Sequence, residues 1–179
     1  MEHCSELVER VRAGDLHAFG ILYDRYGRLV RAICYDRLGN QADAEDLAQE
    51  VFLRAFHKLE QLQHADQFGS WLVEITRRMT IDWHRRNNAI NNLKMEPFFD
   101  LHAKDTDDSQ LSKLEDLHRA ISRLPERERL AIHIFYLTEQ PAPVAQKVLE
   151  LSASGFYKLL ERARANLAKQ MTSKKRVRQ

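Results

Sequence analysis

The sequence predicts an all-α protein in which two small helical domains are joined by a flexible linker. Apolar residues recur at three- and four-residue spacing over most of the 179 residues, which is the pattern of amphipathic helices. Only 6 glycines and 4 prolines are present, few for a chain that must make the frequent turns of a β-protein. The helical pattern stops between Asn87 and Gln110 and then resumes, which divides the chain in two.

The first domain is predicted to contain three main helices. Asp15 is a suitable N-cap for the first of them, and the Gly39-Asn40 pair ends it. We expect a second helix from about Ala42, a loop from Glu60 to Gln67, and a third helix from about Phe68 to Arg86. Their apolar stripes are Phe19, Leu22, Tyr23, Tyr26, Val30 and Ile33, then Leu47, Val51, Phe52, Ala55 and Leu59, then Trp71, Leu72, Ile75, Met79, Ile81 and Trp83.

The second domain resumes the helical pattern from Leu111. Pro125 precedes a predicted helix from Glu126 to Leu137, because a first helical turn tolerates proline. After Gln140-Pro141-Ala142-Pro143 we expect a short helix from Val144 to about Leu151, and then Ser152 as the cap of a final helix. The predicted boundaries are 1–88 for the first domain, 89–110 for the linker, 111–173 for the second domain and 174–179 for a basic tail.

The composition is that of a soluble globular protein, with 44% hydrophobic and 30% charged residues. No run of eighteen apolar residues is present, and the first residues lack the basic-then-apolar order of a signal peptide. We therefore expect a cytoplasmic protein that does not insert into membranes. Cys4 and Cys34 are too few for a disulfide framework, and Cys34 lies in an apolar helical register. Cys4 and His3 are too few ligands for a metal site, so no cofactor is expected.

Charge is strongly segregated along the chain, although the net charge is only +2. Eight basic residues lie between Lys158 and Arg178 against one acid, Glu161, whereas the segment from Asp43 to Glu50 has four acids and no base. Either run alone is also typical of a solvated helix face. Together they indicate one surface for a basic protein and another for nucleic acid.

The end of the chain has the order of a helix-turn-helix: a short helix, a tight turn and a longer basic helix that would enter the major groove. An ordinary helical hairpin with a basic surface has the same pattern, and this alternative stays open. The leading residues of the last helix would reach base edges or phosphates, and its arginines would contact the DNA backbone. These candidate residues are Ser152, Ser154, Tyr157, Lys158, Arg162 and Arg164.

The third helix combines cations with aromatic rings, which suits single-stranded DNA because basic groups bind phosphates and aromatic faces stack on bases. Such stacking contributes about 1–3 kcal/mol per base. Alternatively, both tryptophans are core residues; Trp71, beside the loop, is the favoured DNA-facing candidate. The residues concerned are Arg77, Arg78, His84, Arg85 and Arg86, with Trp71 and Trp83 among them.

Segments in this order resemble those of the extracytoplasmic-function (ECF) sigma factors of bacteria. The sequence DAEDLAQEVFLRAF at 43–56 resembles the polymerase-binding helix of that family, and FGSWLVEITRR at 68–78 and DWHRR at 82–86 are similar to the two ends of its promoter-melting helix. LPERER at 124–129 resembles the start of the C-terminal domain, and LERARANL at 160–167 the end of the recognition helix. The resemblance covers about Leu7 to Met171, with the linker unmatched.

The resemblance implies a non-enzymatic subunit that binds core RNA polymerase and directs promoter-specific initiation. It would contact the clamp helices of the largest polymerase subunit and the flap region, its linker would thread past the polymerase active site, and an anti-sigma factor would inhibit it. The residues implied in clamp binding are Asp43, Asp46, Leu47, Gln49 and Glu50.

For promoter DNA, the resemblance implies that the loop from Leu62 to Gln67 captures a base flipped out of the −10 element, which costs a few kcal/mol of unstacking. The final helix, Ala153 to about Arg164, would read the −35 element through the six residues named above. The implied −10 contacts are Gln63, His64, Asp66, Gln67, Phe68, Trp71, Arg77, Arg78, Arg85 and Arg86.

Two features depart from the family pattern. Glu150 stands where the turn of the C-terminal motif usually has glycine, and this predicts a different turn or a one-residue shift, because glycine relieves the strain of a positive φ. The acidic, β-branched run that usually precedes the motif is replaced by Gln140-Pro141-Ala142-Pro143. The −35 contacts depend on both features.

Other classes of function fit parts of the sequence. A conventional helix-turn-helix regulator would bind duplex operators by itself, and a helical adaptor would use its basic tail for steering alone. The acidic helix followed by a tryptophan-containing basic helix favours a sigma factor over both. An enzyme has little support, because no metal-ligand spacing such as HExxH and no Gly-rich phosphate loop occurs, and the acids after Asn40 suit the dipole of a helix N-terminus.

Overall fold

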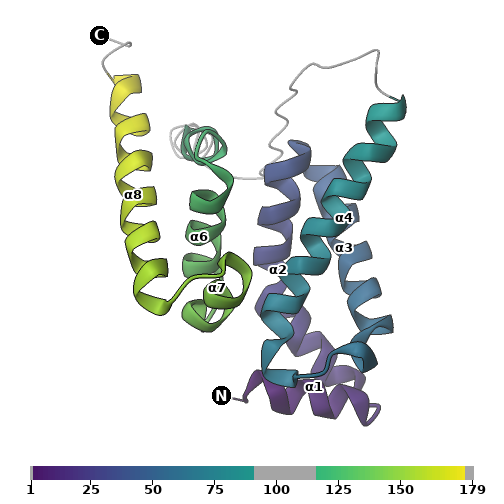
Figure 1. The fold of residues 1–179 in the computed structure, drawn as a ribbon. Coiled ribbons are helices and arrows are strands. Elements are labelled where there is room, and N and C mark those ends of the chain that lie inside the picture. Colours follow the sequence, from purple (N-terminus) through teal and green to yellow (C-terminus); the bar gives the residue numbers. More distant parts are fainter. Residues whose placement is uncertain (1, 91–115, 176–179) are drawn as a thin grey trace, which may run out of the picture.

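The computed structural model describes residues 2–90 and 116–175, and within them the chain is helical with no strand, which confirms the all-α prediction (Figure 1). The first part contains α1 (Cys4–Arg12), α2 (Leu16–Leu38), α3 (Gln41–His57), η1 (Leu59–Gln61), η2 (Ala65–Gln67) and α4 (Phe68–Ile90). The second contains a helix at 116–122, α6 (Glu126–Leu137), α7 (Pro141–Leu149) and α8 (Ala153–Lys175). Residues 91–110 of the expected linker and 176–179 of the expected tail lie outside the described residues.

The helix ends of the first domain follow from local hydrogen bonding. The Asp15 side chain caps α2 by accepting from the backbone N–H groups of His17 at 3.0 Å and Ala18 at 3.3 Å. Gly39 ends α2 with φ 69°, a left-handed conformation that glycine adopts without strain, and the Asn40 side chain then caps α3. These caps confirm the predicted roles of Asp15 and the Gly39-Asn40 break.

One apolar core holds both domains. In the first, α2 packs against α1, α3 and α4, and Cys34 is fully buried in this core, as predicted. The core continues into α6 and α7 through Leu130, Ile134 and Val144, which belong to the same buried cluster. A smaller cluster fixes α8 to α6 and consists of Leu124, Ile132, Leu160 and Ala163. The two domains are therefore packed on each other rather than separated.

Gly69, at the start of α4, lies against both Tyr26 of α2 and Val144 of α7. A Cβ atom there would lie 2.8 Å from the Tyr26 ring and 3.0 Å from Cγ2 of Val144 in α7. Both distances are shorter than ordinary van der Waals contact, so only glycine fits this position. Gly69 thus allows α4 and α7 to pack side by side.

The turn between α7 and α8 corrects the prediction made for Glu150. Glu150 adopts the left-handed conformation itself, with φ 52° and ψ 49°, so the turn is neither different nor shifted. The start of α7 also differs, since the helix begins at Pro141 rather than Val144; prolines are tolerated because the first four N–H groups of a helix have no partner within it. Ser152 accepts from the Gly155 N–H at 3.1 Å, which confirms its capping role.

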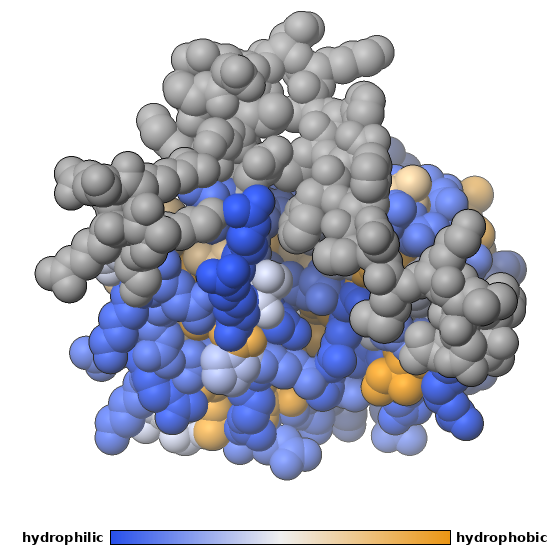
Figure 2. Space-filling view, turned by 90° about the horizontal axis from the view of Figure 1, so that it is seen from above, coloured by the Kyte–Doolittle hydropathy of each residue, from blue (hydrophilic) through white to orange (hydrophobic). Residues whose placement is uncertain are grey.

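Figure 2 shows one face of the molecule. Where that face is not grey, hydrophilic residues predominate and apolar residues form small, separate spots. None of the helices in the described ranges has both the length and the apolar character needed to cross a membrane.

Candidate protein and nucleic-acid interfaces

The acidic part of α3 presents a narrow exposed face. Asp46, Gln49 and Glu50 are exposed, and the last two follow Asp46 by three and four residues, so the three share one side of the helix. Leu53 continues this face and is 61% exposed. The four residues, Asp46, Gln49, Glu50 and Leu53, are called the α3 stripe below. Sequence reasoning missed Leu53, although its position seven residues after Asp46 places it on this face.

Two predicted polymerase contacts lie off this stripe. Leu47 is 2% exposed and packs in the core, so its side chain supports the helix rather than offering a surface to a partner. Asp43 is half-buried in the first turn of α3, where a carboxylate is favoured by the helix dipole, and its backbone N–H donates to the Asn40 side chain.

The loop before α4 is exposed at its tip and anchored at both ends. Gln63, His64 and Asp66 are exposed, and Gln67 is half-buried. At one end, the Arg12 guanidinium donates to the carbonyl oxygens of Leu59 and Leu62, which sequence reasoning did not foresee. At the other end, Ser70 Oγ donates to the Gln67 carbonyl at 2.9 Å.

The aromatic residues that follow the loop are less accessible than predicted. Phe68 is fully buried, so its ring is a core residue and offers no face to a base. Trp71 is half-buried, with its ring centroid 6.0 Å from that of Phe68, and Trp83 is half-buried near the far end of α4. Trp71 therefore keeps part of its surface open beside the loop.

The basic residues of α4 fall into two groups. Arg78, Arg85 and Arg86 are exposed. Arg77 is half-buried and pairs with Glu74 of its own helix at 3.1 Å and with Glu126 of α6 at 3.3 Å. His84 is another of the basic residues predicted to contact DNA from this helix. Its Nε2 donates to the backbone carbonyl of Arg37 at 2.6 Å, so its side chain is bound to α2.

Glu126 is shared between two arginines of the first domain, because Arg37 also pairs with the same carboxylate oxygen. Partial burial alone would raise the pKa of Glu126, but the hydrogen bonds and charges of Arg37 and Arg77 outweigh it and hold the pKa below its usual value. The carboxylate is therefore charged over the whole neutral range.

The predicted duplex-DNA residues at the start of α8 are exposed, but the two arginines already have partners. The Arg162 Nε donates to the buried Glu128 carboxylate at 2.9 Å. The Arg164 guanidinium lies 4.7 Å above the Phe135 ring. Tyr157 and Lys158 are exposed at the leading turns of α8, where a major groove would meet the helix.

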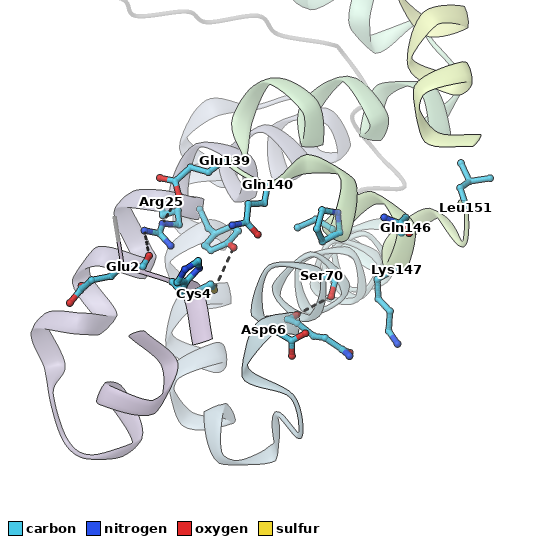
Figure 3. Close-up of a pocket in the computed structure, with 15 residues that line it drawn as sticks. Glu2, Cys4, Arg25, Asp66, Ser70, Glu139, Gln140, Gln146, Lys147 and Leu151 are labelled. Carbon is cyan, nitrogen blue, oxygen red and sulfur yellow. Dashed lines mark hydrogen bonds and ion pairs between the residues drawn. The ribbon is translucent and has the colours of Figure 1, made fainter. Parts of the chain in front are cut away.

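A cleft separates the loop before α4 from the C-terminal domain (Figure 3). It has a volume of about 580 Å³ and is lined on one side by Asp66 and Ser70 and on the other by Gln140, Gln146 and Lys147. The Tyr26 hydroxyl donates to Cys4 Sγ at 3.6 Å on its wall, and burial raises the pKa of both groups. Among the described residues, no cluster of metal-ligating side chains is found here or elsewhere.

Comparison with known proteins identifies the family. Sigma-70 region 2 matches residues 22–90, which run from within α2 to the end of α4. The ECF RNA polymerase sigma factor SigF of Caulobacter vibrioides is 30% identical over 159 residues, covering 88% of this chain and 88% of SigF. The chain belongs to the ECF sigma factors.

Further comparisons agree with this membership. The ECF sigma factor BldN of Streptomyces coelicolor is 31% identical over 169 residues, which span 92% of this sigma factor and 64% of BldN. The solved structure of CnrH in complex with the cytosolic domain of CnrY shares the fold, with a TM-score of 0.68 and 21% identity over 96% of this chain and 99% of CnrH. Region 2 contains all the residues predicted for polymerase and −10 contacts, whereas those predicted for the −35 element lie outside it.

Proposed function

We propose that this sigma factor binds core RNA polymerase through the α3 stripe and directs it to promoters. The observation that carries the proposal is that region 2 has two surfaces of opposite charge. One is the exposed acidic stripe on α3, and the other consists of the exposed arginines of the adjacent α4. The acidic surface suits a basic helical protein partner, and the basic surface suits the DNA backbone.

In the proposed mechanism the promoter contacts are divided among three elements. The exposed loop residues Gln63, His64 and Asp66 take a base flipped from the −10 element, and the open part of Trp71 stacks beside it. The exposed arginines of α4 neutralise phosphates of the melted strand. The start of α8 reads the −35 duplex, with Tyr157 and Lys158 reaching farthest.

Arg162 and Arg164 have a dual role in this proposal. Both residues are exposed, yet each is oriented by α6, through Glu128 or through the Phe135 ring. Orientation by a partner lowers the entropy lost when an arginine binds a phosphate. The two residues thus fix α8 on its domain and also face the DNA backbone.

The protein is proposed to act in the cytoplasm without catalysing a reaction of its own and without a cofactor. Its partners would be core polymerase at the clamp helices and flap region, promoter DNA, and an inhibitory anti-sigma factor. The last of these is supported by CnrH, whose structure is that of a complex with another protein, the cytosolic domain of CnrY.

The test is an in vitro transcription assay with core RNA polymerase on a library of promoter fragments. We expect initiation only when the protein is present, from sites that share paired −10 and −35 sequences. Absence of initiation and of comigration with core polymerase, together with tight binding to duplex DNA alone, would instead identify a conventional helix-turn-helix regulator.

A further inference from the structure

The inference concerns the side of α8 that faces away from its own domain. The opposite side packs on α6 and α7, and its buried residues are Phe156, Leu159, Leu160 and Ala163. A residue two positions earlier lies about 200° around the helix, and this gives an outward side with four exposed members. These residues, called the α8 outer face below, are Ser154, Tyr157, Lys158 and Glu161. In Figure 1, α8 lies on the outer side of α6, away from α2.

The spacing of the α8 outer face is that of a DNA-recognition helix. Its second, third and fourth members follow Ser154 by three, four and seven residues, the intervals at which the recognition helix of a homeodomain contacts bases. The four positions span about 10 Å along the helix axis, which is about the length of three base pairs. The face therefore fits the base edges of a short run of duplex DNA.

The charges on the α8 outer face belong to Lys158 and Glu161. Arg162 lies beside the face, where its Nε donates to Glu128, and Arg164 stacks on an aromatic ring of α6. These contacts hold both arginines on α6, which suits the phosphates beside the groove better than the base edges within it. For Lys158 and Glu161 no ion pair is found among the described residues, so both side chains are available to DNA.

Glu161 is the one acid in the basic run from Lys158 to Arg178. Phosphates repel a carboxylate that faces DNA, so its place on the outer face lowers affinity unless a base donates to it. In the major groove cytosine presents only a donor, the N4 amino group, whereas guanine and thymine present only acceptors and adenine has the N7 acceptor beside its donor. A carboxylate accepts and cannot donate, so cytosine is the base that satisfies Glu161.

We infer that Glu161 reads the −35 element and selects cytosine at one base pair, by accepting a hydrogen bond from N4. Lys158, three residues earlier, donates to O6 and N7 of guanine at a neighbouring base pair. This inference rests on the proposed −35 role of α8 and adds the residue and the base that set part of its specificity.

The test measures transcription by core polymerase with wild-type protein or Glu161→Gln, on a promoter that the wild type uses and whose −35 base pairs are changed one at a time. With the wild type, replacing the selected cytosine is expected to lower initiation about tenfold. With E161Q the preference at this base pair should move to adenine, because an amide accepts from N6 and donates to N7. Preferences at the other −35 base pairs should stay the same.

Asp24→Asn is the matched control, because it removes one negative charge at an exposed position of α2. Its base preferences should equal those of the wild type. The inference is overturned if the wild type prefers cytosine at none of the −35 base pairs, or if E161Q leaves that preference unchanged. It is also overturned if E161Q changes initiation from all −35 sequences by the same factor, since that is the effect of a solvated acid repelled by phosphates.

Wild-type transcription separates this inference from the proposed function. If the wild type initiates from paired −10 and −35 sites while E161Q has the same base preferences, only the inference fails. If the wild type supports no initiation, the proposed function fails. Selection from randomised duplex DNA by the protein alone then tests Glu161 with the same two variants, and the same shift from cytosine to adenine is the expected result.

Discussion

Glu150 is the one described residue other than glycine with a positive φ. In the left-handed conformation its Cβ lies close to the following carbonyl oxygen, which costs about 1–2 kcal/mol for residues that have a side chain. The family position usually carries glycine, so the chain keeps the turn and bears the strain. The turn must keep its shape because it sets the angle between α7 and α8.

We expect Glu150→Gly to raise the free energy of unfolding by about 1 kcal/mol, since it removes the strain and loses part of the gain to a more flexible unfolded chain. For a chain of this size the melting temperature should rise by about 2–4 °C, measured by circular dichroism. Glu150→Ala is the control, because alanine keeps the Cβ and should give no comparable gain. Equal stabilisation by both substitutions would show that the glutamate side chain, rather than the backbone, is responsible.

At the scale of the element, the α3 stripe is the proposed polymerase-binding surface. We expect Asp46→Arg and Leu53→Asp each to weaken binding to core polymerase at least about tenfold, because one reverses a charge and the other places a charge in an apolar contact. Circular dichroism should be unchanged, since both side chains are exposed. The measurement is biolayer interferometry with immobilised core enzyme.

Asp24→Arg serves as the control for these variants, because it makes the same charge reversal at an exposed position of α2. If Asp24→Arg weakened binding as much as Asp46→Arg, overall charge rather than the stripe would explain the effect. If L53D bound normally, the contact would end at Glu50.

The pair of α6 and α8 depends on a buried acid. Glu128 accepts from Arg162 Nε and from Asn166 Nδ2, each at 2.9 Å, and its side chain is 4% exposed. We expect Arg162→Ala to destabilise the protein by about 1–3 kcal/mol, because it leaves this carboxylate with one partner fewer. Differential scanning calorimetry measures the change.

Arg164→Ala is the comparison for this prediction, because Arg164 stacks on an aromatic ring and has no buried acid to satisfy. Its loss should cost about 0.5–1 kcal/mol at this exposed site. The prediction fails if the two variants are equally stable. A second check is E128Q/R162A, which should recover part of the lost stability, since a neutral amide is less costly to bury than a carboxylate.

Elements were more predictable from the sequence than the contacts between them. Periodicity and caps located α2, α3, α4 and α6 to within a few residues, because these signals are local. The Leu53 face could have been found from helical spacing. The roles of Glu126 and Arg12 could not, because each acts on residues far away in sequence, and nothing local distinguishes such a contact from a solvated side chain. The burial of Phe68 could not be predicted for the same reason, because it depends on packing against residues far away in the sequence.

For the whole molecule, the packing of the C-terminal domain on the first domain should weaken in acid. The pKa of Glu126 lies below its ordinary value, so its contribution is fully present above that ordinary value and is lost as the pH falls through the lowered one. The groups facing it are Arg37 and Arg77, which stay charged throughout. We expect the radius of gyration from X-ray scattering to increase as the pH falls toward about 4, at constant helix content.

The variant E126Q distinguishes this effect from general acid expansion. Its scattering should depend less on pH than that of the wild type, because the titrating carboxyl group is absent. An identical pH profile for both proteins would assign the expansion to other carboxyl groups.

The apolar core shared by the two domains has a consequence for what happens after initiation. Separation of α6 and α7 from the first domain exposes Ile134, Val144 and Val148 to water. Exposing these apolar side chains costs free energy unless polymerase or DNA covers them. Once the polymerase leaves the promoter and the subunit is released, the exposed surface drives the halves back together. The chain therefore carries within its own core the apolar surface that rejoins its two domains.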